Sequence, residues 1–375
     1  MTTRYWPAEI VLPGHPDKLC DAIADRIVEE AAHREQRALC GVEVAVHRDQ
    51  VFVTGRVAGQ DAETIDIPAI ARDVFAGSGY NSGWRPAPSE LRVTTDLCVG
   101  PLNPGEAEFR AFADDQSIVT GYAVDLAGTN FLPPEHWLVH QFGHRLHQLR
   151  ATRLDLDLGP DGKALVVLAE ASDRLAVATV SVSLQQGSGG SAVELTRAVR
   201  ELVADTLASA AAAIPGFDPA VPDEVLVNAA GDFVVGGPEG DNGLSGKKLV
   251  IDGYGPRAPI GGGALSGKDF YKADRAGALL ARRLARAIVQ TGAASACSAT
   301  LIFTPGADRA RILSLETSEN RNLAPGRWER LLDLSLAGIG DRYARTPCLA
   351  EIARWGHFTN PHLPWERMSF DGDEG

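Results

Sequence analysis

Apolar residues recur along the chain with two different spacings, and these spacings predict where its strands and helices lie. Alternation of apolar and polar residues, typical of a strand with one buried face, fills residues 41–57 on both sides of a turn at Arg48-Asp49-Gln50. The same pattern surrounds a turn at Ala171-Ser172-Asp173. Apolar residues three and four positions apart instead predict amphipathic helices, which lie at residues 16–35, 192–214 and 273–292.

The last third of the chain adds shorter apolar runs, which we expect to be strands, at residues 225–237, 248–254, 298–303 and 311–317. Hairpins thus alternate with long helices three times, without the regular strand–helix–strand order of a parallel sheet. This order predicts an α+β fold of three similar domains, each a mixed or antiparallel sheet with helices on one face. We expect the domains at residues 1–105, 106–225 and 226–375, with strands exchanged between them.

The composition describes an ordinary folded protein, with 45% hydrophobic and 23% charged residues, and it excludes several other classes. No apolar run reaches the roughly 18 residues of a membrane span, and the amino terminus lacks the pattern of a secretory signal. The five cysteines are odd in number and never in C-x-x-C spacing, which favours a reducing cytoplasm over disulfides or a zinc site. A net charge of −13 argues against general binding of nucleic acids.

Lysine is rare in this chain, because only six of the 36 basic residues are lysines and the other 30 are arginines. Four of the six lie between residues 247 and 272, in the most glycine-rich part of the chain. Lysine offers a compact ammonium group that arginine does not replace, so we expect these positions to bind a concentrated negative charge. The six are Lys18, Lys163, Lys247, Lys248, Lys268 and Lys272.

The stretch "GHPDKLCDAIAD", residues 14–25, has the features of an anion site at the start of a helix. Pro16 suits the first turn of a helix, whose exposed N–H groups and dipole attract negative charge. His15 and Lys18 flank that end, so a phosphate or a developing negative charge fits there. Asp17 is a candidate Mg²⁺ ligand, although an isolated aspartate at this position also stabilises a helix by itself.

Two glycine-rich stretches, residues 231–255 and 261–274, each place a lysine directly after Leu-Ser-Gly and an aspartate nearby. A triphosphate carries about four negative charges, which several lysines and Mg²⁺ ions held by aspartates would neutralise. The second stretch, "GGGALSGKDFYKAD", also matches the G-x-x-x-x-G-K spacing of a P-loop. A P-loop requires a preceding strand and a Ser or Thr after the lysine, whereas prolines precede this loop and Asp269 follows Lys268. We therefore interpret it as a phosphate site of another kind.

Six segments, spread in order between residues 9 and 366, resemble those of the bacterial S-adenosylmethionine synthetase (methionine adenosyltransferase) family. This resemblance implies three similar α+β domains in a pseudo-threefold arrangement, and a homodimer or dimer of dimers with active sites between subunits. The implied reaction converts ATP, methionine and water into S-adenosylmethionine, phosphate and pyrophosphate, with two Mg²⁺ and one K⁺. The segments are "GHPDK", "DQSIVTGYA", "PDGKALVVL", "GDFVVGGPEGDNGLSGKKLVIDGYG", "GGGALSGKDFYKADRA" and "WGHFTNPHLPWE".

The resemblance also implies roles for individual residues. Asp17 and Asp274 would bind Mg²⁺, and Glu43 would bind K⁺. His15 would stabilise the charge that develops on the O5′ oxygen of ATP as the triphosphate leaves. The other residues implied at the site of reaction are Lys163, Lys248, Lys268 and Asp115.

The remaining assignments concern the two substrates. Phe233 would stack on adenine and Asp161 would lie by the ribose. The full set expected to bind ATP is Lys18, Asp161, Phe233, Asp241, Lys247, Lys248 and Lys268. The set expected near the thioether acceptor is Asp241, Lys272 and Arg56.

The chain departs from the family pattern mainly on the acceptor side. Arg56 stands where the family has a glutamate for the substrate ammonium, and a cation there would repel that group. The loop at residues 98–116 offers no glutamine to contact methionine, apolar residues occupy positions 10–13, and Lys247 replaces an arginine. The acceptor is therefore methionine or a related thioether that lacks the ammonium contact. Alternatively, Arg56 turns away into a salt bridge at the subunit interface.

Two other functions remain open at this point. Because the phosphate-binding residues agree best with the family, the chain could be a triphosphatase that has lost the transfer reaction. It could also be a non-catalytic, nucleotide-binding subunit that pairs with an active one. The presence of His15 and both aspartates argues against the second alternative, because a binding module needs no catalyst for a leaving group.

Overall fold

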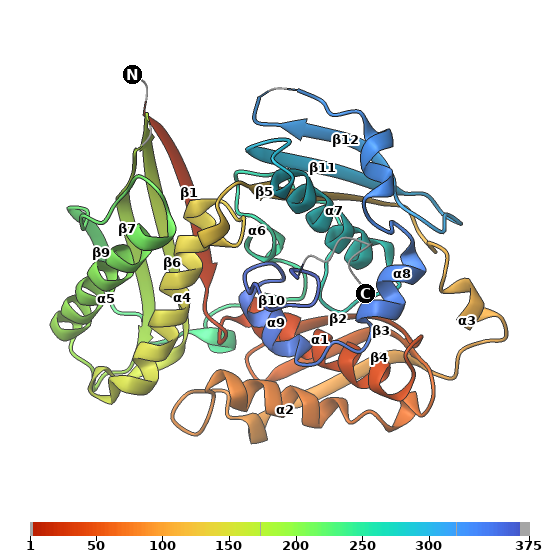
Figure 1. Ribbon diagram of the computed structural model, residues 1–375. Helices are drawn as coiled ribbons and strands as arrows, with labels where there is room; N and C mark the ends of the chain where they lie inside the picture. The colour runs from red at the N-terminus through yellow and green to blue at the C-terminus, as the bar shows by residue number, and fades with distance from the viewer. Residues whose placement is uncertain (1–2, 173, 320, 368–375) are drawn as a thin grey trace.

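In the computed structural model, which describes residues 3–172, 174–319 and 321–367, the strands form three sheets (Figure 1). The first sheet is mixed: β1, β6 and β7 are antiparallel to one another, and β8 and β9 run parallel to β7. Its turn between β6 and β7 is the predicted hairpin, although Asp173 lies outside the described residues. The strands are β1 (Arg4–Val11), β6 (Leu158–Ala171), β7 (Arg174–Gln186), β8 (Phe217–Asp218) and β9 (Glu224–Val227).

The second and third sheets combine strands that are distant in sequence. In the second, β10 pairs with β2, which forms the predicted hairpin with β3, and β4 runs parallel to β3. In the third, β11 lies between β5 and β12 and is antiparallel to both. The strands are β2 (Leu39–His47), β3 (Gln50–Ala58), β4 (Arg92–Gly100), β5 (Ser117–Val124), β10 (Gly243–Leu244), β11 (Ala296–Phe303) and β12 (Arg311–Thr317).

Helices confirm the predicted α+β class and connect the sheets. The α-helices are α1 (Pro16–Arg34), α2 (Ile67–Ser78), α3 (Glu106–Phe109), α4 (Pro134–Thr152), α5 (Ala192–Ala213), α6 (Leu249–Asp252), α7 (Ala273–Gln290), α8 (Leu336–Tyr343) and α9 (Leu349–Trp355). Short 3-10 turns occur at Ala62–Thr64, Pro88–Glu90, Ala127–Thr129, Leu154–Leu156, Gly237–Glu239 and Pro325–Arg330. Among the described residues, no helix is both long and apolar enough to cross a membrane.

Each sheet is covered by helices on one face, as the alternating pattern predicts. α4 and α5 cover the first sheet, α1 and α2 the second, and α7 the third, while α6 and α9 lie between the sheets (Figure 1). The opposite faces carry exposed apolar side chains, among them Tyr5, Phe52, Ile118 and Leu313. Apolar side chains on a bare sheet face are typical of surfaces that another protein covers.

Two predicted strands in the last third of the chain are wrong. Only residues 225–227 of the run 225–237 lie in a strand, β9 (Glu224–Val227), and the run 248–254 contains the short helix α6 instead. Glycines interrupt the first run, because Gly231 and Gly237 adopt positive φ angles of 106° and 61° that break a strand. The second run is too short and too uniformly apolar for its spacing to distinguish a buried strand from a turn of helix.

Candidate active site

The amino end of α1 lies directly against strand β6, and only glycine at position 14 permits this approach. A Cβ at Gly14 would lie 2.3 Å from the carbonyl oxygen of Pro160. The Tyr80 hydroxyl donates a hydrogen bond of 2.6 Å to the Gly14 carbonyl and fixes the turn. His15 then caps the helix, because its Nδ1 accepts a hydrogen bond of 3.2 Å from the backbone N–H of Asp17. A neutral His15 ring therefore carries its proton on Nε2.

The carboxylate of Asp17 is buried at this point, with 1% of its residue surface exposed. Its Oδ1 accepts a hydrogen bond of 2.9 Å from the backbone N–H of Leu244. The ammonium of Lys248 lies 3.0 Å from Oδ2, and that of Lys247 lies 3.7 Å from Oδ1. Oδ2 receives no well-aligned hydrogen bond, although it is buried. The negative charge of Asp17 is thus balanced only by lysine ammonium groups.

Strand β6 and the glycine-rich segment after β9 complete this side of the site. Asp161 is buried, and its Oδ2 accepts a hydrogen bond of 2.7 Å from the backbone N–H of Gly237. Lys163 follows two residues later on the same strand, and Asp241 is close enough to influence the pKa of Asp161. The half-buried ring of Phe233 lies against the same glycine-rich turn. We call this group the His15 cluster: His15, Asp17, Asp161, Lys163, Phe233, Asp241, Lys247 and Lys248.

Burial lowers the pKa of His15 from its usual 6.5 to about 3. Asp17 opposes this shift, whereas the ammonium groups of Lys163 and Lys248 reinforce it. The imidazole is therefore neutral near pH 7 and offers its Nε2–H as a hydrogen-bond donor beside two lysines. Such a donor stabilises an oxygen that gains negative charge without transferring a proton to it.

Five of the other predicted residues line a separate cavity of about 560 Å³ between β2, β3 and the start of α7: Glu43, Asp115, Lys268, Lys272 and Asp274. Lys268 lies 2.5 Å from Oδ2 of Asp274, and the hydroxyl of Ser117 donates to its Oδ1 at 2.5 Å. Lys272 forms an ion pair with Asp114, a residue that the sequence did not single out. We call this group the Asp274 cluster: Glu43, Asp114, Asp115, Lys268, Lys272 and Asp274.

The glycines of "GGGALSGKDFYKAD" bring this loop close to other backbone. A Cβ at Gly263 would lie 2.0 Å from the carboxyl carbon of Asp274, and one at Gly267, where φ is +83°, would lie 2.2 Å from the Val42 carbonyl oxygen. Asp269 faces the interior, where its Oδ2 accepts a hydrogen bond of 2.8 Å from the backbone N–H of Cys40. The residue that excluded a P-loop is therefore structural and does not face the cavity.

The two clusters lie at different ends of the elements that they share. Asp17 begins α1, whereas Asp25, which contacts the loop of Lys268, lies eight residues later and about 12 Å along the helix axis. In β2, Val46 pairs with β10 beside the first cluster, whereas Gly41 bridges to Lys268, about 17 Å away along the strand. Among the described residues, no hydrogen bond or ion pair joins the clusters. One chain thus brings the predicted residues together in two groups.

Lys18 belongs to neither cluster, which corrects its predicted place in ATP binding. Its side chain is completely buried, and its ammonium forms ion pairs with Asp21 and Asp252 and donates 2.9 Å to the carbonyl of Ala353. Lys18 lies on the side of α1 that packs against α9. The sequence alone did not reveal the carboxylates that neutralise the charge of Lys18.

Arg56 is not a free cation either. Both of its terminal nitrogens donate to the carboxylate of Glu106, at 2.7 and 2.8 Å. The alternative of a salt bridge is therefore correct, although the partner lies within the same chain. Sequence reasoning missed Glu106, Asp114 and Ser117; the signals for the first were an acidic loop after β4 and an unexpected arginine on the neighbouring strand β3.

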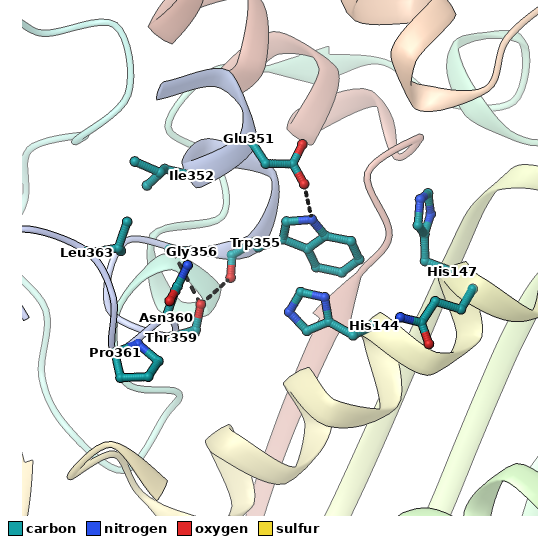
Figure 2. Close-up of a pocket in the computed structure, with 11 residues that line it drawn as sticks. His144, His147, Glu351, Ile352, Trp355, Gly356, Thr359, Asn360, Pro361 and Leu363 are labelled. Atoms are coloured by element: carbon teal, nitrogen blue, oxygen red, sulfur yellow. Dashed lines mark hydrogen bonds between the residues drawn. The ribbon is translucent and has the colours of Figure 1, made fainter. Parts of the chain in front are cut away.

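A second cavity, of about 480 Å³, lies between α4 and α9 and contains none of the predicted residues (Figure 2). The ring of His144 stacks on Trp355 with 3.9 Å between centroids, and the Trp355 indole N–H donates 2.8 Å to Glu351. Among the described residues that line it there is no lysine or arginine, so they offer no permanent positive charge to balance a triphosphate. We therefore place the candidate active site at the two charged clusters.

Metal binding at the two clusters would depend on bound substrate. Among the described residues, no group of three or more histidine, cysteine, aspartate and glutamate side chains is arranged to hold a metal ion. Asp17 and Asp274 fit Mg²⁺ as single carboxylate ligands, because this ion commonly takes one or two carboxylates and completes its shell with phosphates and water. The unsatisfied Oδ2 of Asp17 supports this fit.

Acid is expected to destabilise the fold through the histidines of α4. His136 is fully buried, and burial, reinforced by Arg282, lowers its pKa from 6.5 to about 3. The unfolded chain therefore binds a proton that the folded chain excludes, and stability falls as the pH drops from about 6.5 toward 3. We expect His136→Gln to reduce the slope of unfolding free energy against pH by about 1.4 kcal/mol per unit. Urea unfolding between pH 4 and 5, where the unfolded histidine is almost fully protonated, measures this slope, and the exposed His362→Gln is the control. An equal slope in both variants would contradict the expectation.

Comparison with known proteins gives full-length matches. Sequence profiles of S-adenosylmethionine synthetase match residues 3–96 (N-terminal domain), 110–233 (central domain) and 235–367 (C-terminal domain). The S-adenosylmethionine synthase of Corynebacterium kroppenstedtii is 33% identical over 395 aligned positions, which cover 98% of this chain and 97% of that protein. That of Petrotoga mobilis is 30% identical, with the same coverage. That of Mycobacterium ulcerans is 33% identical and covers 97% and 96%.

Proposed function

The chain belongs to the S-adenosylmethionine synthetase family, and from this premise we propose that it transfers the adenosyl group of ATP to the sulfur of methionine. The observation that carries the proposal is the pairing of Asp17 with Lys248 and of Asp274 with Lys268. Each pair couples a carboxylate suited to Mg²⁺ with an ammonium suited to phosphate. A triphosphate that enters between them would replace each lysine's carboxylate partner with a phosphate oxygen.

The division of the site into two clusters supports a homodimer or a dimer of dimers. We propose that the His15 cluster of one subunit faces the Asp274 cluster of another, so that the active site forms between them. The bare sheet faces, with exposed Phe52 and Ile118 beside the Asp274 cluster, are surfaces that a second copy would cover. An isologous dimer would contain two such sites.

In the proposed reaction, the methionine sulfur attacks C5′ of ATP, the C5′–O5′ bond breaks, and O5′ leaves with its electron pair on the triphosphate. The neutral His15 would donate its Nε2–H to this oxygen, and Lys163, Lys248 and Lys268 would balance the growing charge. Water would then cleave the triphosphate into phosphate and pyrophosphate. Lys247, which is exposed beside Asp17, would contribute charge to that step without the fork of an arginine.

The remaining residues would position the substrates. Phe233 would stack on the adenine, and Asp161 would lie by the ribose. Asp241 and Lys272 would meet at the amino acid only across the proposed interface, because they lie in different clusters. Asp115 would face the reacting groups from the Asp274 cluster.

Metal ions would supply charge neutralisation for the triphosphate when bound. We propose Asp17 and Asp274 as the residues that hold two Mg²⁺ and Glu43 as the residue that holds K⁺. All five cysteines are free, which supports a reducing compartment, and we propose the cytoplasm.

One assay tests this function directly. The protein is incubated with ATP, Mg²⁺ and K⁺, with and without methionine, and the sulfonium product, phosphate and pyrophosphate are followed by mass spectrometry and phosphorus NMR. Methionine-dependent formation of S-adenosylmethionine supports the proposal. Phosphate release without any sulfonium product would identify a triphosphatase instead, and binding of ATP without turnover would identify a non-catalytic subunit.

Replacement of His15 by asparagine is expected to lower kcat about 100-fold. Asparagine is a good helix cap, so the start of α1 should remain folded. The loss would reflect the missing Nε2–H at the leaving oxygen, and the KM for ATP should change little. Steady-state kinetics at pH 7 with both substrates saturating measures the effect. A kcat within threefold of the unmodified protein would rule out this role for His15.

A further inference from the structure

The ion pair between Arg56 and Glu106 lies at the edge of the acceptor side of the candidate site. Thr54 and Gly55 line the cavity of the Asp274 cluster, and Arg56 is the next residue along β3. Arg56 also pairs across the sheet with Gly41, another residue of the cavity wall. Its guanidinium is 37% exposed, so its charge would act on a charged ligand in the cavity.

Glu106 forms an ion pair with Arg56 and balances its positive charge. The two carboxylate oxygens meet the two terminal nitrogens of Arg56 in a forked arrangement, the strongest form of this contact. One oxygen also accepts a hydrogen bond of 2.6 Å from the backbone N–H of Asn103. Bonding to Arg56 and to Asn103 lowers the pKa of Glu106 to about 2, so the carboxylate is ionised at neutral pH.

The same contact holds the segment that ends at the cavity. Residues 101–116 leave β4, form the short α3 at Glu106, and deliver Asp114 and Asp115 to the cavity wall. Arg110 anchors the middle of the segment through its ion pair with Asp269, and Ala113 binds the backbone of Ala307 at 2.8 Å. Arg56 is thus the anchor for the first part of a segment that supplies two carboxylates.

The neutral pair adds no charge to the cavity. Four carboxylates and two ammonium groups line the cavity, and the ions proposed at Asp274 and Glu43 would offset their net charge of −2. An Arg56 without its partner would instead place an uncompensated positive charge beside the cavity and repel an ammonium group.

We propose that Arg56 and Glu106 act as one neutral unit that positions residues 101–116 and keeps the acceptor cavity selective for a thioether that carries an ammonium group. This inference rests on the proposed function and adds to it a residue pair that determines acceptor specificity. Glu106 is then the residue that determines specificity, and Arg56 is its positioning partner.

Three variants test the unit. Glu106→Gln leaves an uncompensated cation, and we expect the KM for methionine to rise about tenfold while the KM for ATP stays the same. The KM for 4-(methylthio)butanoate, which lacks the ammonium, should stay the same or fall. Arg56→Glu alone places a second carboxylate beside that of Glu106. The two negative charges repel each other, so this variant should not improve methionine use. The exchange Arg56→Glu with Glu106→Arg restores the pair and should return the methionine KM to within about threefold.

A purely structural role would instead raise the KM of both acceptors equally, and that result would overturn the charge assignment. Improved methionine use by Arg56→Glu alone would show that Arg56 repels the ammonium despite Glu106, and would also overturn it. Arg174→Gln, which breaks a surface pair of 3.0 Å with Asp218 in the first sheet, is the matched control and should change no KM.

Failure of the role proposed for the Arg56–Glu106 pair can be distinguished from failure of the proposed function. If the unmodified protein forms no sulfonium from any thioether, the function is wrong and the charge assignment falls with it. Limited proteolysis within residues 101–116 still tests whether the ion pair holds this segment in place. Each single variant should be cleaved faster there, and the exchange variant should regain protection; equal cleavage in all of them would refute positioning.

Discussion

Equal amounts of Asp17→Asn and Asp274→Asn proteins, each nearly inactive alone, are expected to recover about one quarter of the unmodified turnover after their subunits exchange. Each substitution removes a carboxylate from a different cluster and should lower kcat about 1000-fold. Random exchange makes about half of the dimers mixed, and one of the two sites in a mixed dimer is free of both substitutions. Turnover before and after mild denaturation and refolding of the mixture measures the recovery.

The control pairs two variants of the same cluster. Asp17→Asn mixed with Lys248→Gln should recover nothing, because every site in the mixed dimer then carries one substitution in its His15 cluster. Mass spectrometry of the intact oligomers establishes that subunits have exchanged. No recovery in a mixture proven to contain mixed dimers would contradict an active site built from two subunits.

Arg275→Met is expected to lower the free energy of unfolding by about 3–5 kcal/mol, because it leaves the buried carboxylate of Asp25 without its partner. The two side chains are at most 1% exposed, and the guanidinium meets both carboxylate oxygens at 2.7 and 3.0 Å. Asp25 also accepts a hydrogen bond of 2.9 Å from Gly267, and Arg275 donates 2.9 Å to the Lys268 carbonyl. The pair therefore joins α1 to the loop that carries Lys268, which we propose to bind the triphosphate.

Urea unfolding at pH 7 measures this loss, and Arg174→Gln at the surface should cost less than about 1 kcal/mol. The double variant Asp25→Leu with Arg275→Met should regain part of the stability, since it removes both buried charges. A loss of no more than that of the surface control would show that the pair does not stabilise the fold. Retained stability with lost ATP binding would show that it acts on the loop alone.

The pattern of apolar residues was sufficient for most of the fold. The hairpin at residues 41–57 and the helices at 192–214 and 273–292 occur within one or two residues of their predicted ends. These elements are long and strongly periodic, so local burial decides their structure. The runs at 225–237 and 248–254 failed, because short apolar stretches take their conformation from surrounding packing and from glycines.

The sequence by itself also determined which side-chain charges are available to a site. Rare lysines beside glycines and aspartates predict phosphate binding, because few other side chains match that charge at close range. Only the tertiary structure decided which of these residues meet. It separates the His15 cluster from the Asp274 cluster, buries Lys18 between two carboxylates, and pairs Arg56 with Glu106. Side-chain charge is a property of the sequence, whereas its neutralisation depends on contacts between residues as many as 304 positions apart, which only the folded chain creates.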